Sequence, residues 1–358
     1  MLHQTEIRPC EIADEWAIRS EFWNSEIGNS KPKRRKRERN SAPLILCGHG
    51  VSLRIENGAL VIRDGFTHYP QSQASYRYFR GDLELPPRIV LLDGSGTVSF
   101  DVLSWLAEQG VALARIKWTG EIAIAGGGHG YAADPAKVEW QRSTRADHGK
   151  RLAFASDLIG RKLEASIVTL ETHFAASPAR DAATAKARDA LAELASAPVA
   201  DMGTIHKIEG GCASAYFTAW RDVELRWTGL GRRPIPDAWR EFTQRSSILT
   251  GRKPGNWKAS HPLNAMLNYA YAVKAAQLQV EALADGYDPA FGIMHNADRS
   301  YSAFAYDLIE PERPKIDAAI LAFIAKRSFA AADFVIRKDG VCRLSPQLAR
   351  AVAILPVS

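Results

Sequence analysis

The stretch Val51-Ser-Leu-Arg-Ile-Glu-Asn-Gly-Ala-Leu-Val-Ile62 decides how the first folded part of the chain is built. Its first half alternates apolar with polar residues, which is the period that places one face of a β-strand against a core. Asn57-Gly58 follows, and an Asn-Gly pair between two such runs is the strongest short-range signal for a hairpin. The stretch therefore predicts two antiparallel strands that turn at Asn57 and Gly58.

The sequence after this hairpin contains further strand patterns. Residues 88–93 form an apolar run typical of a buried strand, and residues 99–109 have helical spacing before a glycine that stops a helix. Residues 111–118 and 122–125 are apolar runs on either side of a Thr-Gly turn, and they predict a second hairpin. We expect residues 41–130 to form a small β-rich domain.

Beyond this region the pattern becomes helical. Residues 138–174 carry apolar side chains at helical spacing, and residues 178–197 are rich in alanine with charged residues between. Pro262 suits the first position of a helix, and the residues after it repeat the same spacing. We therefore expect an α+β protein, in which the small N-terminal β-rich domain is followed by a larger all-helical domain over residues 131–358.

The excess of positive charge lies in one segment. The chain has 358 residues, of which 46% are hydrophobic and 24% charged, an ordinary globular composition. Its formal net charge of +6 equals that of residues 31–39 alone, because bases and acids balance elsewhere. The basic residues of this segment are Lys31, Lys33, Arg34, Arg35, Lys36, Arg37 and Arg39. A basic surface on the rest of the chain must therefore arise by segregation of charge.

We expect residues 1–40 to form an N-terminal extension that holds a disordered basic arm. Residues 1–26 mix aromatic and acidic side chains and are compatible with a short helix, whereas residues 27–40 are polar and basic. The basic run could be read as a nuclear localisation signal, or as a solvated arm with electrostatic affinity for nucleic acid, which we prefer. Both interpretations leave the fold unchanged.

The cysteines are few and scattered, at Cys10, Cys47, Cys212 and Cys342. The absence of a CxxC pair excludes a cysteine-rich zinc module and a disulfide scaffold, and a reducing compartment fits best. No apolar stretch approaches the ~20 residues of a membrane span. Acidic residues near the N-terminus argue against a signal peptide. We expect a soluble, cytoplasmic protein that does not associate with a membrane.

Three windows combine ionisable side chains with local helix signals. Glu209 stands among glycines and small residues, which allow another chain to approach closely, although an acidic residue at a helix start needs no function. His295 closes an apolar run, a position more typical of a core histidine than of a ligand. Asp307 and Glu310 are three residues apart, so on a helix they would share one face.

Together these four side chains suggest a metal site. Two close carboxylates repel each other unless a cation or a proton neutralises one of them. Carboxylate oxygens with one imidazole nitrogen suit Mg²⁺ or Mn²⁺, and the absence of thiolate ligands argues against structural zinc. A divalent ion held in this way could stabilise a leaving oxyanion in phosphodiester chemistry.

The windows occur in a fixed order along the chain. They read Glu-Gly-Gly-Cys-Ala-Ser-Ala-Tyr-Phe at 209–217, His-Pro-Leu-Asn-Ala-Met-Leu-Asn-Tyr-Ala-Tyr at 261–271, Gly-Ile-Met-His at 292–295 and Tyr-Asp-Leu-Ile-Glu-Pro-Glu-Arg-Pro at 306–314. In these motifs the sequence resembles the CRISPR-associated integrase-endonuclease family, the universal first Cas protein of spacer acquisition. With the β-rich domain that opens near Leu44, the resemblance covers roughly residues 44–350.

The resemblance implies a site and a set of partners. It implies that the β-rich domain mediates a homodimer and that a small companion Cas protein completes a heterohexamer. It also implies binding of double-stranded DNA with single-stranded ends and of CRISPR repeat DNA. By position, the family's metal ligands fall on Glu209, His295 and Glu310, its further acidic position on Asp307, and an asparagine near its active centre on Asn264. The N-terminal extension has no counterpart in the family core.

The implied function is that of a metal-dependent DNA endonuclease and integrase in a prokaryotic cell. A 3′-hydroxyl of incoming DNA would attack a phosphodiester bond and insert a spacer into a CRISPR repeat array. Such a direct phosphoryl exchange needs no ATP, in line with the lack of a P-loop motif. Two alternatives stay open: a transposon-type integrase of the same fold, and a DNA-binding subunit that has lost catalysis.

Overall fold

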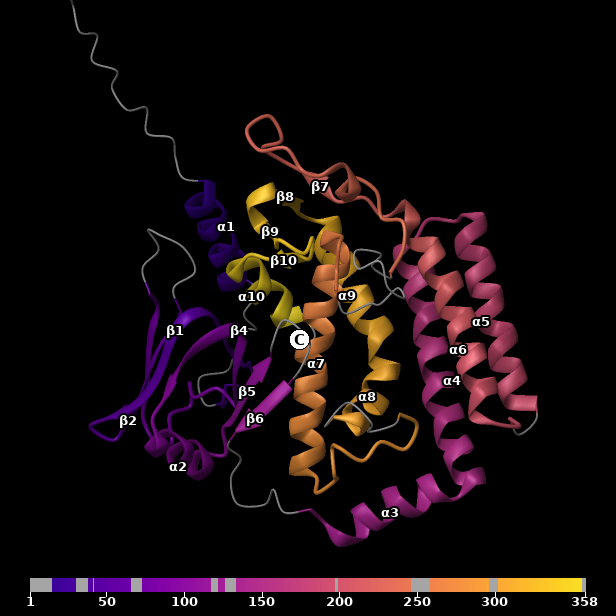
Figure 1. Ribbon diagram of the computed structural model, residues 1–358, viewed down its shortest axis with the longest axis horizontal. Coiled ribbons are helices and arrows are strands. Elements are labelled where there is room, and N and C mark those ends of the chain that lie inside the picture. The colour runs from indigo at the N-terminus through magenta and orange to yellow at the C-terminus, as the bar shows by residue number, and fades with distance from the viewer. Residues whose placement is uncertain are drawn as a thin grey trace, which may run out of the picture.

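The molecule has two parts that lie side by side, a β-sheet and a larger, mostly helical part (Figure 1). The computed structural model describes residues 15–29, 38–40, 42–65, 73–116, 122–125, 133–196, 199–245, 258–295 and 302–355. The sheet comes first in the chain and the helices follow, so the α+β architecture predicted from the sequence is confirmed.

The β-rich part is a six-stranded mixed sheet. Its strands are β1 (Leu44–Glu56), β2 (Ala59–Arg63), β3 (Ser75–Tyr78), β4 (Arg88–Val98), β5 (Ala112–Ile116) and β6 (Ile122–Ala125), in the spatial order β3-β2-β1-β4-β5-β6. β1 and β2 pair antiparallel around Asn57 and Gly58, whose φ angles of 51° and 77° are those of a two-residue hairpin turn. The predicted first hairpin is thus confirmed, and so is the antiparallel pairing of β5 with β6.

Both faces of this sheet are covered. Helix α2 (Phe100–Gln109) links the parallel strands β4 and β5 and packs Trp105 and Leu106 against one face. On the opposite face, side chains such as Val90 belong to a core that is shared with the helical part. Parallel strands covered on both faces need apolar residues at successive positions, which explains the unbroken apolar run in β4.

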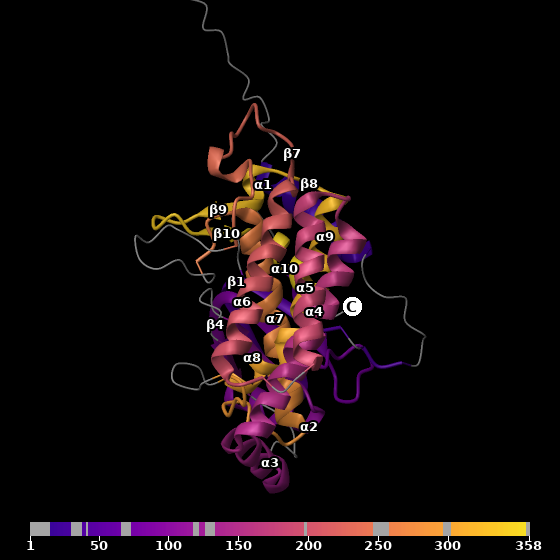
Figure 2. The ribbon, with the colours of Figure 1, turned by 90° about the vertical axis from the view of Figure 1, so that its right-hand side faces the viewer.

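The larger part is built mainly from helices. They are α3 (Pro135–Ala146), α4 (His148–His173), α5 (Pro178–Ser196), α6 (Met202–Thr218), α7 (Pro262–Ala284), α8 (Ala303–Ile309), α9 (Arg313–Ala325) and α10 (Pro346–Ile354). The helical spacing predicted over residues 138–174 corresponds to two helices, α3 and α4. Asp147 leaves the helical conformation, with a ψ of 115°, and its side chain accepts a hydrogen bond from the backbone N–H of Lys150 to begin α4. Figure 2 shows α4, α5 and α6 packed as one group.

Short strands interrupt this helical part, so the all-helical domain we expected is in fact mostly helical. β7 (Arg226–Trp227) pairs with β8 (Ser328–Phe329), and β9 (Phe334–Ile336) pairs with β10 (Cys342–Leu344). A turn at Asp339 and Gly340 connects β9 and β10, and Gly340 has a φ of 78°. These strands gave no clear signal in the sequence, because strands of two or three residues are too short to show an alternating pattern of apolar and polar residues.

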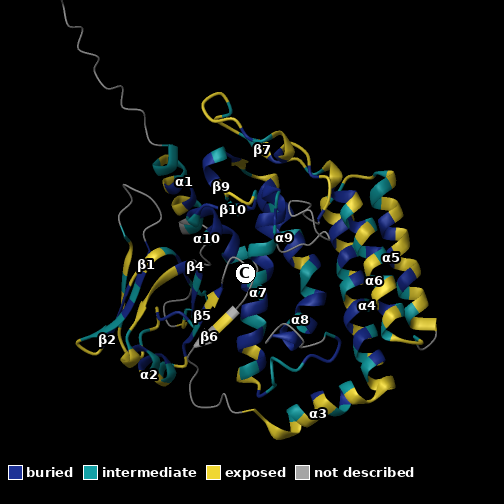
Figure 3. Cartoon of the chain, in the orientation of Figure 1, coloured by how far each residue is buried: buried dark blue, intermediate teal, exposed yellow. Residues whose placement is uncertain are grey.

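Helix α7 forms the centre of the molecule. Figure 3 shows it buried along most of its length between the sheet and the remaining helices. Leu263, Met266, Leu267 and Ala270, the residues whose spacing predicted this helix, are completely buried. Because α7 packs against α8, α9, α10 and β5, it fixes these three helices to the sheet.

The N-terminal extension includes a helix that packs against residues near the C-terminus. This is α1 (Glu15–Asn29), which confirms the short helix expected there. Trp23 is completely buried, and its Nε1 donates a hydrogen bond to Asp333 Oδ1 at 2.9 Å. Arg19 forms an ion pair with the same carboxylate at 2.6 Å. α1 is therefore part of the packed core of the larger domain.

Several predicted features fall outside the described residues. Cys10 and the basic residues Lys31, Lys33, Arg34, Arg35, Lys36 and Arg37 lie there, whereas Arg39 is described and exposed. Cys47, Cys212 and Cys342 are buried, and none of these three cysteines is in a disulfide. Of the helices that the structure describes, none is long and apolar enough to cross a membrane.

Candidate active site

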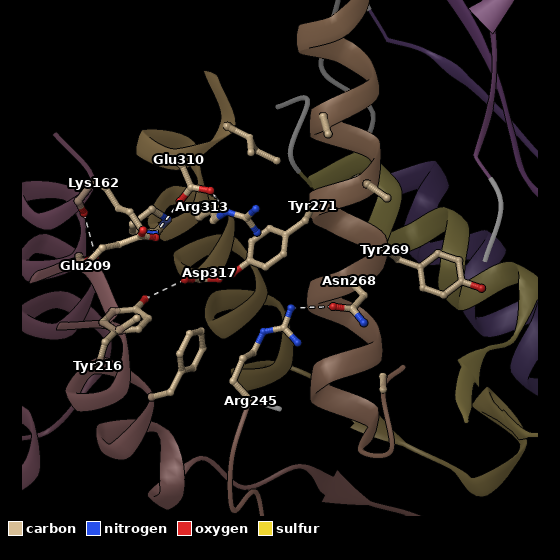
Figure 4. Close-up of a pocket in the computed structure, with 18 of the residues that line it drawn as sticks. Lys162, Glu209, Tyr216, Arg245, Asn268, Tyr269, Tyr271, Glu310, Arg313 and Asp317 are labelled. Carbon is tan, nitrogen blue, oxygen red and sulfur yellow. Dashed lines mark hydrogen bonds and ion pairs between the residues drawn. The ribbon is translucent and has the colours of Figure 1, made fainter. Parts of the chain in front are cut away.

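Glu209 and Glu310 lie on different elements but meet at the same cation, the ammonium group of Lys162 (Figure 4). Lys162 belongs to α4, and its Nζ lies 2.5 Å from Glu209 Oε1 and 2.6 Å from Glu310 Oε2. The two carboxylates are 101 residues apart in the sequence, and the fold brings them to one point. The sequence had predicted that these two acids share a site, but it gave no sign that a lysine joins them.

Glu209 does not lie at the start of a helix, where an acidic residue would need no function. α6 begins after Asp201, whose carboxylate accepts a hydrogen bond from the backbone N–H of Thr204 at 2.8 Å. Glu209 therefore lies in the middle of the helix and does not interact with its N-terminus. Its side chain is 23% exposed and turns towards α4.

Glu310 is the more buried of the two carboxylates, with a side chain 5% exposed. It begins a short 3₁₀-helix (Glu310–Glu312), and its second oxygen accepts a hydrogen bond from Arg313 Nε at 3.0 Å. Burial alone would raise the pKa of Glu310, but the positive charges of Arg313 and Lys162 outweigh it and lower the pKa to about 2. Glu310 is thus a fixed negative charge at any physiological pH.

Asp307 and Glu310 contact different partners, although both lie on one helical stretch. α8 ends at Ile309 and continues directly into a 3₁₀-helix that begins at Glu310, with Ile309 and Glu310 both in the right-handed helical conformation. Asp307 is completely buried, and its two oxygens accept hydrogen bonds from the backbone N–H groups of Ile293, Met294 and His295. These contacts make Asp307 an anchor for the loop that carries His295.

The imidazole of His295 is oriented by this same carboxylate. Its Nδ1 lies 2.8 Å from Asp307 Oδ1, so Nε2 is the nitrogen that a ligand would meet. Burial lowers the pKa of His295, but the hydrogen bond and charge of Asp307, followed by the charges of Glu310 and Glu209, raise it overall. The two glutamates are therefore close enough to act on this imidazole electrostatically.

Two arginines hold the loop of residues 291–295 from the other side. Arg151 on α4 donates to the carbonyl oxygens of Ile293 at 2.9 Å and Met294 at 3.2 Å. Arg145 on α3 donates to the carbonyl oxygen of His295 at 3.1 Å. The loop is thus fixed by side chains from three helices. Sequence reasoning missed both arginines, because contacts 142 to 150 residues apart leave no local pattern.

A cavity of about 440 Å³ opens beside the two glutamates. Its lining includes Lys162, Glu209 and Glu310 at one end and Arg245, Asn268, Tyr271 and Asp317 at the other (Figure 4). The buried carboxylate of Asp317 accepts hydrogen bonds from the hydroxyl groups of Tyr216, at 3.1 Å, and Tyr271. Burial raises the pKa of Asp317 to about 6, and its tyrosine and arginine neighbours lower it only in part. The polar wall of the cavity is thus ordered by internal hydrogen bonds.

Asn264 lies behind this wall. It is 1% exposed, its Nδ2 donates to the carbonyl oxygen of Gln244 at 3.0 Å, and its Oδ1 accepts from Arg245. Arg245 also donates to Asn268 Oδ1 at 2.6 Å. Asn264 therefore supports Arg245, which lines the cavity, and does not itself line the cavity.

The residues fit a divalent cation only if the lysine moves. Within the part of the chain that the structure describes, no three His, Cys, Asp or Glu side chains stand close enough together to hold a metal ion. Glu209 and Glu310 nevertheless converge on a single cation, and their charges also act on the imidazole of His295, whose Nδ1 is engaged by Asp307. Two hard oxygen donors and one imidazole are a suitable donor set for Mg²⁺ or Mn²⁺.

The fold is that of solved Cas1 proteins and of a casposase. The chain superposes on a casposase bound to an integration product with a TM-score of 0.70, at 21% identity, covering 88% of this chain and 81% of that one. It superposes on a Cas1 protein from Thermotoga maritima with a TM-score of 0.63, at 14% identity, covering 87% and 88%. It also matches a chain of a Cas6-RT-Cas1–Cas2 complex with a TM-score of 0.64, at 16% identity, covering 92% of this chain and 34% of that one.

Residues 44–354 match the family model for the CRISPR associated protein Cas1, and the chain belongs to this family. It is 26% identical over 145 residues to a CRISPR-associated endonuclease Cas1 of Methanospirillum hungatei, which covers 40% of this chain and 37% of that protein. It is also 26% identical over 317 residues to one from Archaeoglobus fulgidus, covering 86% and 85%. The resemblance seen in the sequence motifs is thereby confirmed, and α1 lies outside the matched residues.

Proposed function

We propose that this chain is a divalent-metal-dependent DNA endonuclease and integrase that inserts short DNA fragments into a CRISPR repeat array. The observation that carries the proposal is the convergence of Glu209 and Glu310 on one cation, with His295 held beside them by Asp307. Membership of the Cas1 family and the names of its curated relatives support it.

Glu209, Glu310 and His295 Nε2 would hold the ion. When bound, an Mg²⁺ or Mn²⁺ ion supplies stabilisation of negative charge on the scissile phosphate and on the leaving 3′-oxygen. Asp307 keeps the Nδ1 nitrogen of His295 engaged, so the ring is fixed with Nε2 available as a ligand. Arg313 keeps Glu310 ionised, which maintains the negative charge on which binding of a cation depends.

The DNA would enter through the cavity beside the two glutamates. Arg245 and Lys162 lie in its wall and provide positive charge for a phosphate group, while Tyr271 and Tyr216 provide aromatic surface. The basic segment of residues 31–39 supplies a further electrostatic attraction to the duplex. We propose double-stranded DNA with single-stranded ends and CRISPR repeat DNA as the substrates.

We further propose that the chain works as a homodimer joined through the β-rich part, with a small companion Cas protein that completes a heterohexamer. One of its fold neighbours is part of a complex with Cas2, which supports a partner of this kind. Light scattering of the full chain, alone and with the companion, tests the assembly. A mass that corresponds to a monomer in both samples at micromolar concentration would contradict it.

A second candidate is a transposon-type integrase that acts without a CRISPR array. The fold similarity to a casposase bound to an integration product favours it. The two candidates differ in their target, because a CRISPR integrase requires repeat DNA and a transposon-type enzyme does not. A catalytically silent DNA-binding subunit is the third possibility, and the presence of Glu209, His295 and Glu310 argues against it.

One experiment separates all three. A labelled short duplex is incubated with a supercoiled plasmid, with or without a CRISPR repeat, in Mn²⁺ or in EDTA. The proposed function predicts strand transfer into the repeat plasmid in Mn²⁺. This transfer should be lost in His295→Ala. It should be retained in the matched control His173→Ala, which changes an exposed histidine on α4. Equal transfer into both plasmids would indicate the transposon-type enzyme, and DNA binding without any transfer would indicate the silent subunit.

A further inference from the structure

Lys162 is a mostly buried cation, and the proposed function gives it no role beyond a positive charge in the cavity wall. Its side chain is 14% exposed, and its ammonium group contacts both glutamates of the proposed metal site. Leu163 beside it is buried in the core between α4 and neighbouring helices, so the backbone at this position is fixed. Any change in the position of the ammonium group must therefore come from rotation about its side-chain bonds.

The charges around the two glutamates already balance. The carboxylates of Glu209 and Glu310 carry two negative charges, and Lys162 and Arg313 carry two positive charges within hydrogen-bond distance of them. A divalent ion at the same oxygens would leave an excess of positive charge in a partly buried site. Since Lys162 Nζ lies 2.5 and 2.6 Å from two proposed ligand oxygens, a metal ion and this ammonium group cannot occupy the site together.

We propose that Lys162 is an exchangeable counter-ion of this site: the ammonium group holds the two glutamates in place until a metal ion displaces it, and it then binds a phosphate of the DNA. The inference rests on the proposed function. Arg313 is less suited to this exchange, because it contacts Glu310 alone and its guanidinium group stacks 4.9 Å from the ring centroid of Tyr271. Lys162 has a flexible four-carbon chain, and its ammonium group stacks on no aromatic ring of the described residues.

The cavity gives the displaced group a place to go. Lys162 lines the same cavity as Glu209 and Glu310, so a rotated ammonium group stays beside the position of the scissile phosphate. A DNA phosphate in the cavity would stabilise the rotated position of the Lys162 ammonium group. A metal ion bound to the two glutamates would force the ammonium group into that position. Metal and DNA should therefore each increase the affinity for the other, with Lys162 as the link between them.

The test compares the Mn²⁺ affinity of the full chain with that of Lys162→Met and Lys150→Met. Lys150 is the matched control, because it is an exposed lysine on the same helix. Affinity is measured by isothermal titration calorimetry, without DNA and with a short duplex. Without DNA, Lys162→Met should bind Mn²⁺ roughly tenfold more tightly than the wild type, since a competing charge is gone. With the duplex, the affinity of the wild type should rise, and that of Lys162→Met should rise much less.

The outcomes separate this inference from the proposed function. If the wild type binds Mn²⁺ through His295 but Lys162→Met binds it equally or more weakly, the exchange is overturned and the metal site stands. If the wild type binds no Mn²⁺, both are overturned. Should Lys162→Met fold only when Mn²⁺ is present, the exchange is supported, because the ion then replaces the missing ammonium group. If it folds in neither condition, Lys162→Gln, which keeps a hydrogen bond without the charge, is measured with the same expectations.

Discussion

His295 Nδ1 lies 2.8 Å from Asp307 Oδ1, and the same carboxylate also accepts hydrogen bonds from three consecutive backbone N–H groups. One buried side chain thus sets both the path of the loop and the orientation of the imidazole. The loop also requires Gly292, because a Cβ atom there would lie 2.7 Å from the carbonyl oxygen of His295 and 2.8 Å from the side chain of Ala303. The proposed ligand is therefore positioned before any metal ion arrives.

Asp307→Asn should destabilise the protein and weaken metal binding together. An amide offers one acceptor oxygen where the carboxylate offers two, so buried N–H groups lose their partners and the free energy of unfolding should fall by about 3 kcal/mol. Urea denaturation measures this change. Asp237→Asn, at a side chain that is 98% exposed, is the control and should have no effect. A variant as stable as the wild type would contradict the anchoring role of Asp307.

Arg151→Met should loosen the loop of residues 291–295 without removing any proposed ligand. The substitution deletes two hydrogen bonds to backbone carbonyl oxygens of that loop. Hydrogen exchange of the loop's amides should become faster, and Mn²⁺ affinity should fall while DNA binding is retained. Arg142→Met, at an exposed arginine on α3, serves as the control. Unchanged exchange in Arg151→Met would show that Asp307 and Arg145 fix the loop without Arg151.

Glu310 should make the stability of the metal-free protein depend on acid pH. Its pKa is lowered from 4.5 to about 2 in the folded state, so folding is stabilised by its ionisation above pH 4.5. This contribution, about 3 kcal/mol from the size of the shift, is lost as the pH falls through 4.5 towards 2. Glu310→Gln should lack this part of the pH dependence when unfolding is followed in urea. Glu164→Gln, at an exposed acid on α4, should retain it, and an identical profile for Glu310→Gln would refute the assignment.

Trp23→Ala should show that α1 is a structural part of the larger domain. The indole is completely buried and donates a hydrogen bond to Asp333, so its removal leaves a cavity and deprives this carboxylate of one hydrogen bond. We expect a loss of about 4 kcal/mol in the free energy of unfolding. Ile18→Ala, at a residue of the same helix that is 49% exposed, should change it by far less. A small effect of Trp23→Ala would mean that α1 is dispensable.

The basic segment should contribute to DNA binding through charge alone. Replacing its seven lysines and arginines by serine should weaken binding at low salt and flatten the plot of log affinity against log salt, by a slope of roughly 0.9 for each phosphate that is no longer neutralised. Metal-dependent cleavage should persist, because no proposed ligand lies in residues 31–39. Equal salt slopes for both proteins would leave the segment as a solvated tail or a docking peptide.

The sequence was informative where structure depends on neighbours in the chain. The hairpin at Asn57-Gly58 and the helix that begins at Pro262 were predicted because turn chemistry and apolar spacing act over a few residues. The break at Asp147 was not predicted, because it depends on a single side chain that caps α4.

The sequence predicted which residues form the candidate site, but not the contacts that these residues make. Glu209, His295 and Glu310 were found through motifs of a known family, and the structure brings the two glutamates together. The role of Lys162 was not predictable, because its partners lie 47 and 148 residues away on other elements. The contacts of Asp307 with the loop that carries His295 were not predictable either, because they join residues 12 to 14 positions apart on different elements.

The most direct test of the account is a crystal structure of the full chain grown with Mn²⁺, with anomalous scattering used to locate the metal. The account predicts one anomalous peak within coordination distance of Glu209, Glu310 and His295 Nε2, with the ammonium group of Lys162 turned away from both carboxylates. An anomalous peak elsewhere, or none at these residues while Lys162 still bridges Glu209 and Glu310, would contradict it.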